Sequence, residues 1–152
     1  MEVRRETVLA APAERVWEAI CQPGTMLYVL KGLFGFPSLA GRFDPVREGE
    51  RGHGWIMLFH IIPFARWTIE VVRVDPAART IATREGGGII RRWNHTLHAE
   101  PLPGGGCRYT DVIDLDAGAF TSATAAATAV IFWYRQRRLG KLARRHLAVA
   151  PG

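Results

Sequence analysis

The spacing of apolar residues becomes helical in the last third of the chain. Residues 117–134 carry no charge and lead directly into Arg135-Gln136-Arg137-Arg138. Residues 120–147 lack proline and are rich in alanine and leucine, which predicts one long helix interrupted only at Gly140. At 3.6 residues per turn, one face of this helix collects the following residues: Thr121, Thr124, Ala125, Thr128, Ala129, Phe132, Gln136, Leu139, Ala143 and Leu147. The helix therefore has a side to bury, and the first half of that side is unusually small.

The first forty residues predict a strand followed by two short helices. Residues 3–10 alternate between apolar and polar, and a proline at position 12 suits the first turn of a helix that runs to Ile20. A second short helix is expected over 25–30. The loop after it is punctuated by glycine yet carries Phe34 and Phe36, so we expect these two rings to cover an apolar surface.

The middle of the chain has the period of strands separated by turns. Glycine- and proline-rich segments bound six predicted strands, at 41–47, 54–62, 66–74, 80–85, 89–99 and 107–116. Their short connections favour an antiparallel meander, because a parallel crossover needs a dozen or more residues. Without repeats or linkers, residues 1–152 are expected to form a single domain.

This order of elements predicts an α+β fold with a curved seven-stranded antiparallel sheet. Such a sheet has one concave face, and only the long C-terminal helix is available to cover it. Alanine and threonine side chains are too small to fill that concavity. We therefore expect a cavity between the sheet and the C-terminal helix.

Composition and charge narrow the classes of partner. The chain is 48% hydrophobic and 22% charged, as is usual for a globular protein, and its net charge is +6. Six basic residues lie in the final helix, so the charge describes one local surface and predicts no nucleic-acid partner: Arg135, Arg137, Arg138, Lys141, Arg144 and Arg145. Two lone cysteines, Cys21 and Cys107, favour a reducing cytoplasmic location with both thiols free.

The uncharged stretch is barely long enough to cross a bilayer. It is mostly alanine, threonine and serine, and its apolar stripe continues through the basic part at helical spacing. We therefore expect no stable membrane insertion.

Four segments carry a resemblance to a known superfamily. Ala11-Pro12-Ala13-Glu14-Arg15-Val16-Trp17, Trp93-Asn94-His95-Thr96, Gly105-Gly106-Cys107-Arg108-Tyr109-Thr110-Asp111 and Phe132-Trp133-Tyr134-Arg135, with the meander, resemble the START-like or SRPBCC superfamily. It includes the helix-grip proteins of the birch-pollen-allergen type and the polyketide cyclase/dehydrase-like proteins. The resemblance implies a helix-grip fold with a deep pocket for lipids, polyketides or other hydrophobic molecules. Members range from carriers to enzymes, so the fold does not decide the function.

The predicted pocket draws on the sheet, the second short helix and the long helix. Its candidate lining residues are Tyr28, Phe34, Phe36, Met57, Phe59, Trp67, Ile69, Trp93, His95, Thr124, Ala125, Thr128 and Phe132. Aromatic stripes are usually core, and the alternative is that these rings simply fill the space under the helix. The small inner face of the helix favours a pocket of several hundred Å3.

A histidine, a tyrosine and an aspartate are expected on one face of the last hairpin. Period-two alternation places His95 on the face of Trp93, and Tyr109 and Asp111 on the face of Ile113. In a dry pocket these groups could act as general acid and base. The alternative is that His95 and Asp111 form a satisfied pair that stabilises the hairpin.

Most other charged residues of the sheet are expected to form ladders on its solvated face, namely Glu70, Arg73, Arg84, Arg91 and Arg92. Glu85 is the exception, since it ends a strand just before three glycines, near the expected pocket rim. The five histidines are too scattered for a metal centre. The glycine runs at 86–88 and 104–106 each join two predicted strands, so they are expected to be turns and not phosphate-binding loops. Neither a metal nor another cofactor is therefore predicted.

Three functions remain open from the sequence. The first is binding of a hydrophobic or amphipathic small molecule, lipid- or polyketide-like. The second is a cyclase- or dehydratase-type enzyme that uses His95, Asp111 and Tyr109. The third is a partner-binding or membrane-surface module that uses the basic helix. The outer face of that helix also predicts a homodimer or partner contact, through Ala123, Ala126, Ala127, Val130, Trp133 and Tyr134.

Overall fold

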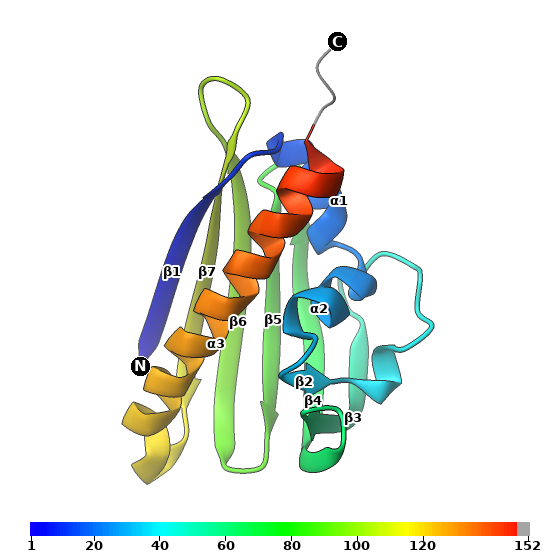
Figure 1. Cartoon of the computed structure of the whole chain (residues 1–152). Coiled ribbons are helices and arrows are strands. Elements are labelled where there is room, and N and C mark those ends of the chain that lie inside the picture. Colours follow the sequence, from blue (N-terminus) through cyan, green and yellow to red (C-terminus); the bar gives the residue numbers. More distant parts are fainter. Residues whose placement is uncertain (149–152) are drawn as a thin grey trace.

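Seven strands form one curled antiparallel sheet, and the long C-terminal helix lies across its concave face (Figure 1). The computed structural model describes residues 1–148. The strands are β1 (Glu2–Leu9), β2 (Phe34–Gly35), β3 (Arg51–Leu58), β4 (Ile62–Asp75), β5 (Thr80–Gly87), β6 (Ile90–Pro101) and β7 (Cys107–Asp116). Their order in the sheet is β1-β7-β6-β5-β4-β3-β2, so β1 and β2 are the edges. The predicted α+β helix-grip fold is confirmed.

Two short helices follow the first strand, as predicted. They are α1 (Ala13–Ile20) and α2 (Pro23–Leu30). The long helix α3 (Thr121–Leu142) is preceded by a 3-10 turn, Gly118–Phe120, and followed by a π-helical turn, Ala143–Leu147. The expected interruption at Gly140 is wrong, because α3 continues through it without a break.

The predicted strand over 41–47 is wrong. Pro45 has no N–H to donate to a ladder, and Gly41 has a φ of 79°, a left-handed conformation that is foreign to strands. The segment is held instead by a hydrogen bond from the backbone N–H of Val46 to the carbonyl of Cys21. The seventh strand is Phe34–Gly35, which pairs with β3.

The core has two parts under α3. One joins α1, α2 and the C-terminal end of α3 to the sheet, and includes Leu9, Val16, Trp17, Val29, Leu30, Tyr109 and Leu139. The other lies under the first half of α3 and consists of Ile113, Leu115, Ala125 and Phe132. Phe34 and Phe36 pack partly buried against the first part, which confirms that they cover an apolar surface.

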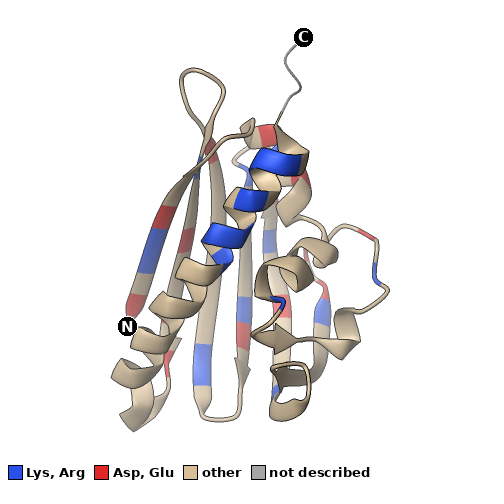
Figure 2. Ribbon diagram, viewed as in Figure 1, with Lys and Arg blue, Asp and Glu red and all other residues tan. Residues whose placement is uncertain are grey.

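The basic residues of α3 gather in its C-terminal half, while its first half carries no charge (Figure 2). Some of them pack on the protein: Arg138 donates from Nε to the carbonyl of Tyr28 at 2.8 Å, and its guanidinium lies 4.5 Å from the centre of the Tyr28 ring. On the outer face of the helix, Val130 and Trp133 are 65% and 45% exposed. None of the helices described here is long and apolar enough to cross a bilayer.

Candidate functional site

The register of the strands places His95, Tyr109 and Asp111 on the concave face. His95 lies opposite Ile113 on β7, and side chains alternate between the two faces of a strand. Ile113 is fully buried under α3, and Tyr109 and Asp111 share its face. The predicted trio is therefore brought together beneath the helix.

Asp111 is the centre of a buried hydrogen-bond network. It is 0% exposed, and its Oδ1 accepts from Nε2 of His95 and from the hydroxyl of Tyr109, both at 2.9 Å. Its Oδ2 accepts from Nε2 of Gln136 at 2.9 Å, and the same nitrogen donates to the carbonyl of Arg5 at 3.0 Å. The network joins β1, β6, β7 and α3, so it ties both the edge strand and the helix to the centre of the sheet.

The electrostatics keep Asp111 ionised and Tyr109 neutral. Burial alone would raise the pKa of Asp111, but the Arg135 guanidinium and the hydrogen bond from His95 outweigh it and lower that pKa. Burial, followed by the charge of Asp111, holds the pKa of Tyr109 well above its ordinary value. Both groups are thus fixed in their usual protonation states, which suits a structural role.

His95 is the member of the trio with an atom left for a ligand. Because its Nε2 donates to Asp111, Nδ1 of the neutral ring is an acceptor. Within residues 1–148 this Nδ1 forms no hydrogen bond, and it is not among the fully enclosed polar atoms that lack a partner, which are Asn94 Oδ1 and Arg135 Nε. The His95 side chain is 7% exposed, so Nδ1 is the ring nitrogen left for a ligand. Its ring meets that of Phe132 edge-on, with centroids 5.1 Å apart.

A row of aromatic rings continues from His95 along the concave face. The centroids of Phe132 and Trp93 are 6.2 Å apart, and those of Trp93 and Trp67 are 5.9 Å apart in an edge-to-face arrangement. Phe132 is buried, whereas Trp67, Trp93 and the neighbouring Ile69 are only partly buried. The row thus begins in the core and ends in an apolar wall that α3 does not fully cover.

The threonines of α3 contribute less polarity to this wall than the sequence suggested. Thr128 and Ala125 are buried facing the sheet, and Thr124 is partly buried. The Thr124 hydroxyl donates to the carbonyl of Phe120 at 2.8 Å, and that of Thr128 donates to the carbonyl of Thr124 at 2.7 Å. Both protons are used within the helix, so these hydroxyls can only accept from a ligand.

Glu85 also faces the concave side. It lies opposite Ile69 on β4 and Trp93 on β6. Its Oε2 accepts from the indole Nε1 of Trp67 at 2.7 Å, and its Oε1 accepts from the hydroxyl of Thr83 at 2.6 Å. The sequence marked Glu85 as an exception to the surface ladders but did not include it among the site residues. Period-two alternation along β5 places Glu85 on the same face as the buried Ile81 and Thr83, and this pattern could have identified it from the sequence.

Several predicted lining residues lie apart from the aromatic row. Phe59 is 54% exposed at the tip of the β3–β4 hairpin, where its φ of 51° turns the chain. Met57 pairs with Gly35 at the edge of the sheet. The ring centroids of Phe34 and Phe64 are 6.3 Å apart, and the Arg138 guanidinium lies over the ring of Tyr28. A role for these residues in binding remains a prediction.

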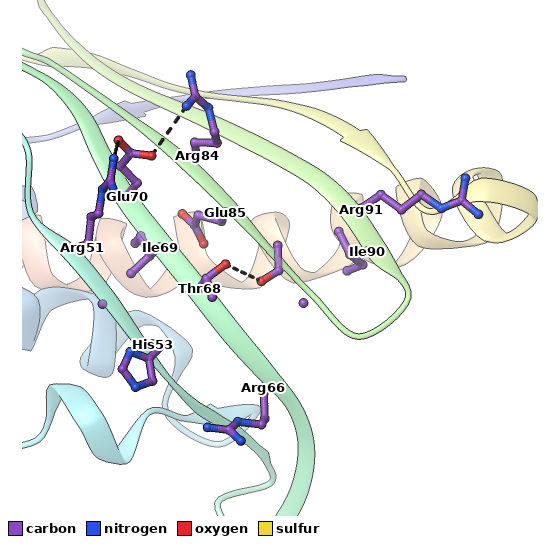
Figure 3. Close-up of a pocket in the computed structure, with 13 residues that line it drawn as sticks. Arg51, His53, Arg66, Thr68, Ile69, Glu70, Arg84, Glu85, Ile90 and Arg91 are labelled. Atoms are coloured by element: carbon purple, nitrogen blue, oxygen red, sulfur yellow. Dashed lines mark hydrogen bonds and ion pairs between the residues drawn. The ribbon is translucent and has the colours of Figure 1, made fainter.

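Two hollows open on the described structure without a lining residue from α3, and Ile69 and Glu85 are among the residues that line the larger one. One, of about 740 Å3, opens over β3 to β6 beside the ion pairs of Glu70 with Arg51 and Arg84, which are 3.2 and 3.6 Å long (Figure 3). The other, of about 400 Å3, adjoins Pro12 and the β6–β7 turn. The pairs at Glu70 confirm the predicted surface ladder for Glu70 and Arg84. Neither hollow lies between the sheet and α3, so a ligand space there remains a proposal.

The described residues hold no cluster of three or more His, Cys, Asp or Glu side chains suited to a metal ion. Cys21 and Cys107 are free and buried, and burial raises the pKa of each thiol to about 11. Neither thiol is therefore an activated nucleophile at neutral pH.

Comparison with known proteins identifies a matching family model and a set of solved structures with a similar fold. The model of the family described as "Domain of unknown function (DUF8410)" matches residues 7–143. No curated protein sequence matches the chain. Among solved structures, protein CV1439 from Chromobacterium violaceum aligns with a TM-score of 0.74 and 18% identity, covering 93% of this chain and 96% of its own.

Two enzymes have the same architecture. Norcoclaurine synthase from Thalictrum flavum, in complex with dopamine and hydroxybenzaldehyde, aligns with a TM-score of 0.71 and 15% identity over 96% of this chain and 87% of its own. The Zhui aromatase/cyclase from Streptomyces sp. R1128 aligns with a TM-score of 0.67 and 19% identity over 100% and 98%. Identities this low establish the fold alone. The chain belongs to the family described as "Domain of unknown function (DUF8410)", and it has the helix-grip fold that these solved structures share.

Proposed function

We propose that this protein binds a hydrophobic or amphipathic small molecule, lipid- or polyketide-like, against the concave face beside α3. The observation that carries the proposal is the row formed by Phe132, Trp93 and Trp67, which leaves the core and ends in partly exposed indoles. Large aromatic side chains contribute strongly when they are buried, so a ligand that covers these indoles would bind through the hydrophobic effect.

The surroundings of the row support the same proposal. Trp67, Ile69 and Trp93 stay partly exposed on this wall, so a ligand can cover them without opening the core. The solved relatives include a synthase in complex with dopamine and hydroxybenzaldehyde and an aromatase/cyclase. Ligand sites in general are mostly apolar with a few polar groups, as on this wall.

The free Nδ1 of His95 favours an enzyme of the cyclase or dehydratase type as a second candidate function. A neutral imidazole whose other nitrogen is held by a carboxylate is a general base. In such a reaction Nδ1 would take a proton from the carbon beside a carbonyl, leaving an enolate. Asp111 and Tyr109 would position His95 and would not touch the substrate, because both are enclosed.

Binding is tested by native mass spectrometry of the purified protein, followed by calorimetric titration with the hydrophobic species that co-purifies or, failing one, with 1-decanol. Trp93→Leu should weaken binding about tenfold, because it removes the middle ring of the row. Trp55→Leu is the matched control, since Trp55 is 48% exposed and on the other face of the sheet. Equal affinities for both variants, or no binding by the unaltered protein, would overturn the proposal.

The enzyme candidate has a separate test. Acetophenone in D2O exchanges its methyl protons slowly, and a base at His95 should accelerate that exchange, as followed by proton NMR. His95→Gln should abolish the acceleration while leaving acetophenone binding in place. If the unaltered protein binds acetophenone without accelerating the exchange, the enzyme candidate is wrong and only the binding function remains.

A further inference from the structure

Glu85 places a negative charge on an otherwise apolar part of the concave wall. Its neighbours across the strands are Ile69 and Trp93, and Trp67 reaches it with the indole N–H. In the part of the chain that the structure describes, Glu85 forms no ion pair, and no dashed line joins it to the arginines drawn around it in Figure 3. Burying a carboxylate without a countercharge is costly, and Glu85 is partly buried.

The hydrogen bonds that Glu85 receives come from neutral groups. Trp67 Nε1 donates to Oε2 and the Thr83 hydroxyl donates to Oε1, one donor to each oxygen. A carboxylate offers about four lone-pair directions, so roughly one on each oxygen remains open. The two bonds fix the orientation of the carboxylate without neutralising it.

None of the nearby arginines forms an ion pair with Glu85 among the described residues. Arg84 precedes Glu85 in β5 and therefore points to the opposite face, where it pairs with Glu70 at 3.6 Å. Arg91 lies against Gly118 at the start of α3, and its charge lowers the pKa of Asp116, after the larger effect of the backbone N–H of Gly118. The negative charge of Glu85 is thus available to a bound molecule.

The rings beside Glu85 complete a site of recognisable chemistry. Trp67 and Trp93 stand edge-to-face, with centroids 5.9 Å apart, and both are partly exposed. Indole faces attract organic cations, and tryptophan does so best among the aromatic residues. Trp67 turns its N–H edge to Glu85, and Trp93 lies opposite Glu85 on the next strand, so the carboxylate supplies a charge beside partly exposed aromatic surface.

We propose that the ligand of the concave face carries an organic ammonium group, which is seated between Glu85 and the rings of Trp67 and Trp93. This inference rests on the proposed function, since it names the class of ligand for the same wall. The ammonium group would take the open lone pairs of Glu85, and the hydrophobic part of the ligand would extend along Trp93 toward Phe132.

The test compares three ten-carbon probes that differ in the head group: decyltrimethylammonium, 1-decanol and decanoate. Titration calorimetry below the critical micelle concentration should give an affinity about tenfold higher for the ammonium than for the alcohol, with the carboxylate weakest. Glu85→Gln keeps an oxygen for Trp67 and should remove the preference for the cation while leaving the affinity for decanol within twofold. Glu70→Gln, at a partly buried carboxylate on the opposite face, is the matched control and should keep the preference.

The outcomes separate the two proposals. Equal affinities for the ammonium and the alcohol in the unaltered protein would overturn the ammonium site and leave the hydrophobic site in place. A preference that survives Glu85→Gln or is lost in Glu70→Gln would assign the charge effect to the general surface and overturn it too. No binding of any probe would overturn the proposed function together with the inference.

Discussion

The two halves of the concave face differ in what covers them. Under α3, the half made by β1, β7 and β6 is closed by Asp111 and its partners, and its core residues are almost fully enclosed. The half made by β5, β4 and β3 presents Trp67, Ile69 and Glu85, all partly exposed. The same fold thus uses polar groups in two ways: a saturated network holds the helix to the sheet, and an unpaired carboxylate stands on the open wall. The closed half carries stability, and the open half is available to a ligand.

The largest expected effect comes from breaking the closed half. Asp111→Asn removes the buried charge to which His95, Tyr109 and Gln136 are oriented and on which the Arg135 guanidinium acts. We expect a loss of about 3 kcal/mol in the free energy of unfolding, measured by urea denaturation. Glu85→Gln on the open half should cost clearly less, because that side chain is partly exposed and forms no ion pair among the described residues. Equal losses would remove the distinction between the halves.

Acid should reduce the contribution of the closed half. The pKa of Asp111 is lower in the folded state than in the unfolded chain, where it is about 4. Its stabilising contribution is therefore complete above about pH 4 and declines as the pH falls toward the folded-state pKa. The difference in unfolding free energy between the unaltered protein and Asp111→Asn should shrink as the pH falls below 4. A difference independent of pH down to pH 2 would contradict the ionised state of Asp111.

A smaller effect is expected from filling the open half. Thr124 is partly buried in the first half of α3, so Thr124→Leu adds bulk beside the proposed ligand space. It should weaken the binding of decyltrimethylammonium severalfold with little change in the melting temperature. Ala126→Leu, on the exposed side of the same helix, is the control and should leave the affinity unchanged. Equal effects of the two substitutions would place the ligand elsewhere.

Periodicity in the sequence predicted most of the fold. Alternation along 107–116 and the helical stripe from Thr121 to Leu139 are strong, long-range patterns, and both elements form where they were expected. The two-residue strand Phe34–Gly35 is too short to leave a pattern, so the prediction placed a strand at 41–47 instead. There the conformation of Gly41 and the missing N–H of Pro45 decide against strand pairing.

The site was predicted less completely because its partners come from distant strands and the helix. Face alternation brought His95, Tyr109 and Asp111 together, yet Gln136 lies 25 residues from Asp111, and no local pattern pairs them. Arg135 was assigned to the basic surface, whereas its guanidinium stacks 4.5 Å from the ring centre of Phe132 and its charge acts on Asp111. Phe59 counted as a lining residue by its apolar character alone, which does not reveal a turn at the hairpin tip.

The indole N–H signals of the five tryptophans test the central claim most directly. Trp67 lies on the open half and Trp93 on β6 at its border, whereas Trp17 is buried in the core, Trp55 lies on the opposite face of the sheet, and Trp133 lies on the outer face of α3. In a nitrogen–proton NMR titration with decyltrimethylammonium, each signal being assigned by a single tryptophan-to-phenylalanine variant, the signals of Trp67 and Trp93 should shift while the other three stay in place. Shifts confined to Trp55 or Trp133 would contradict a ligand site on the concave face.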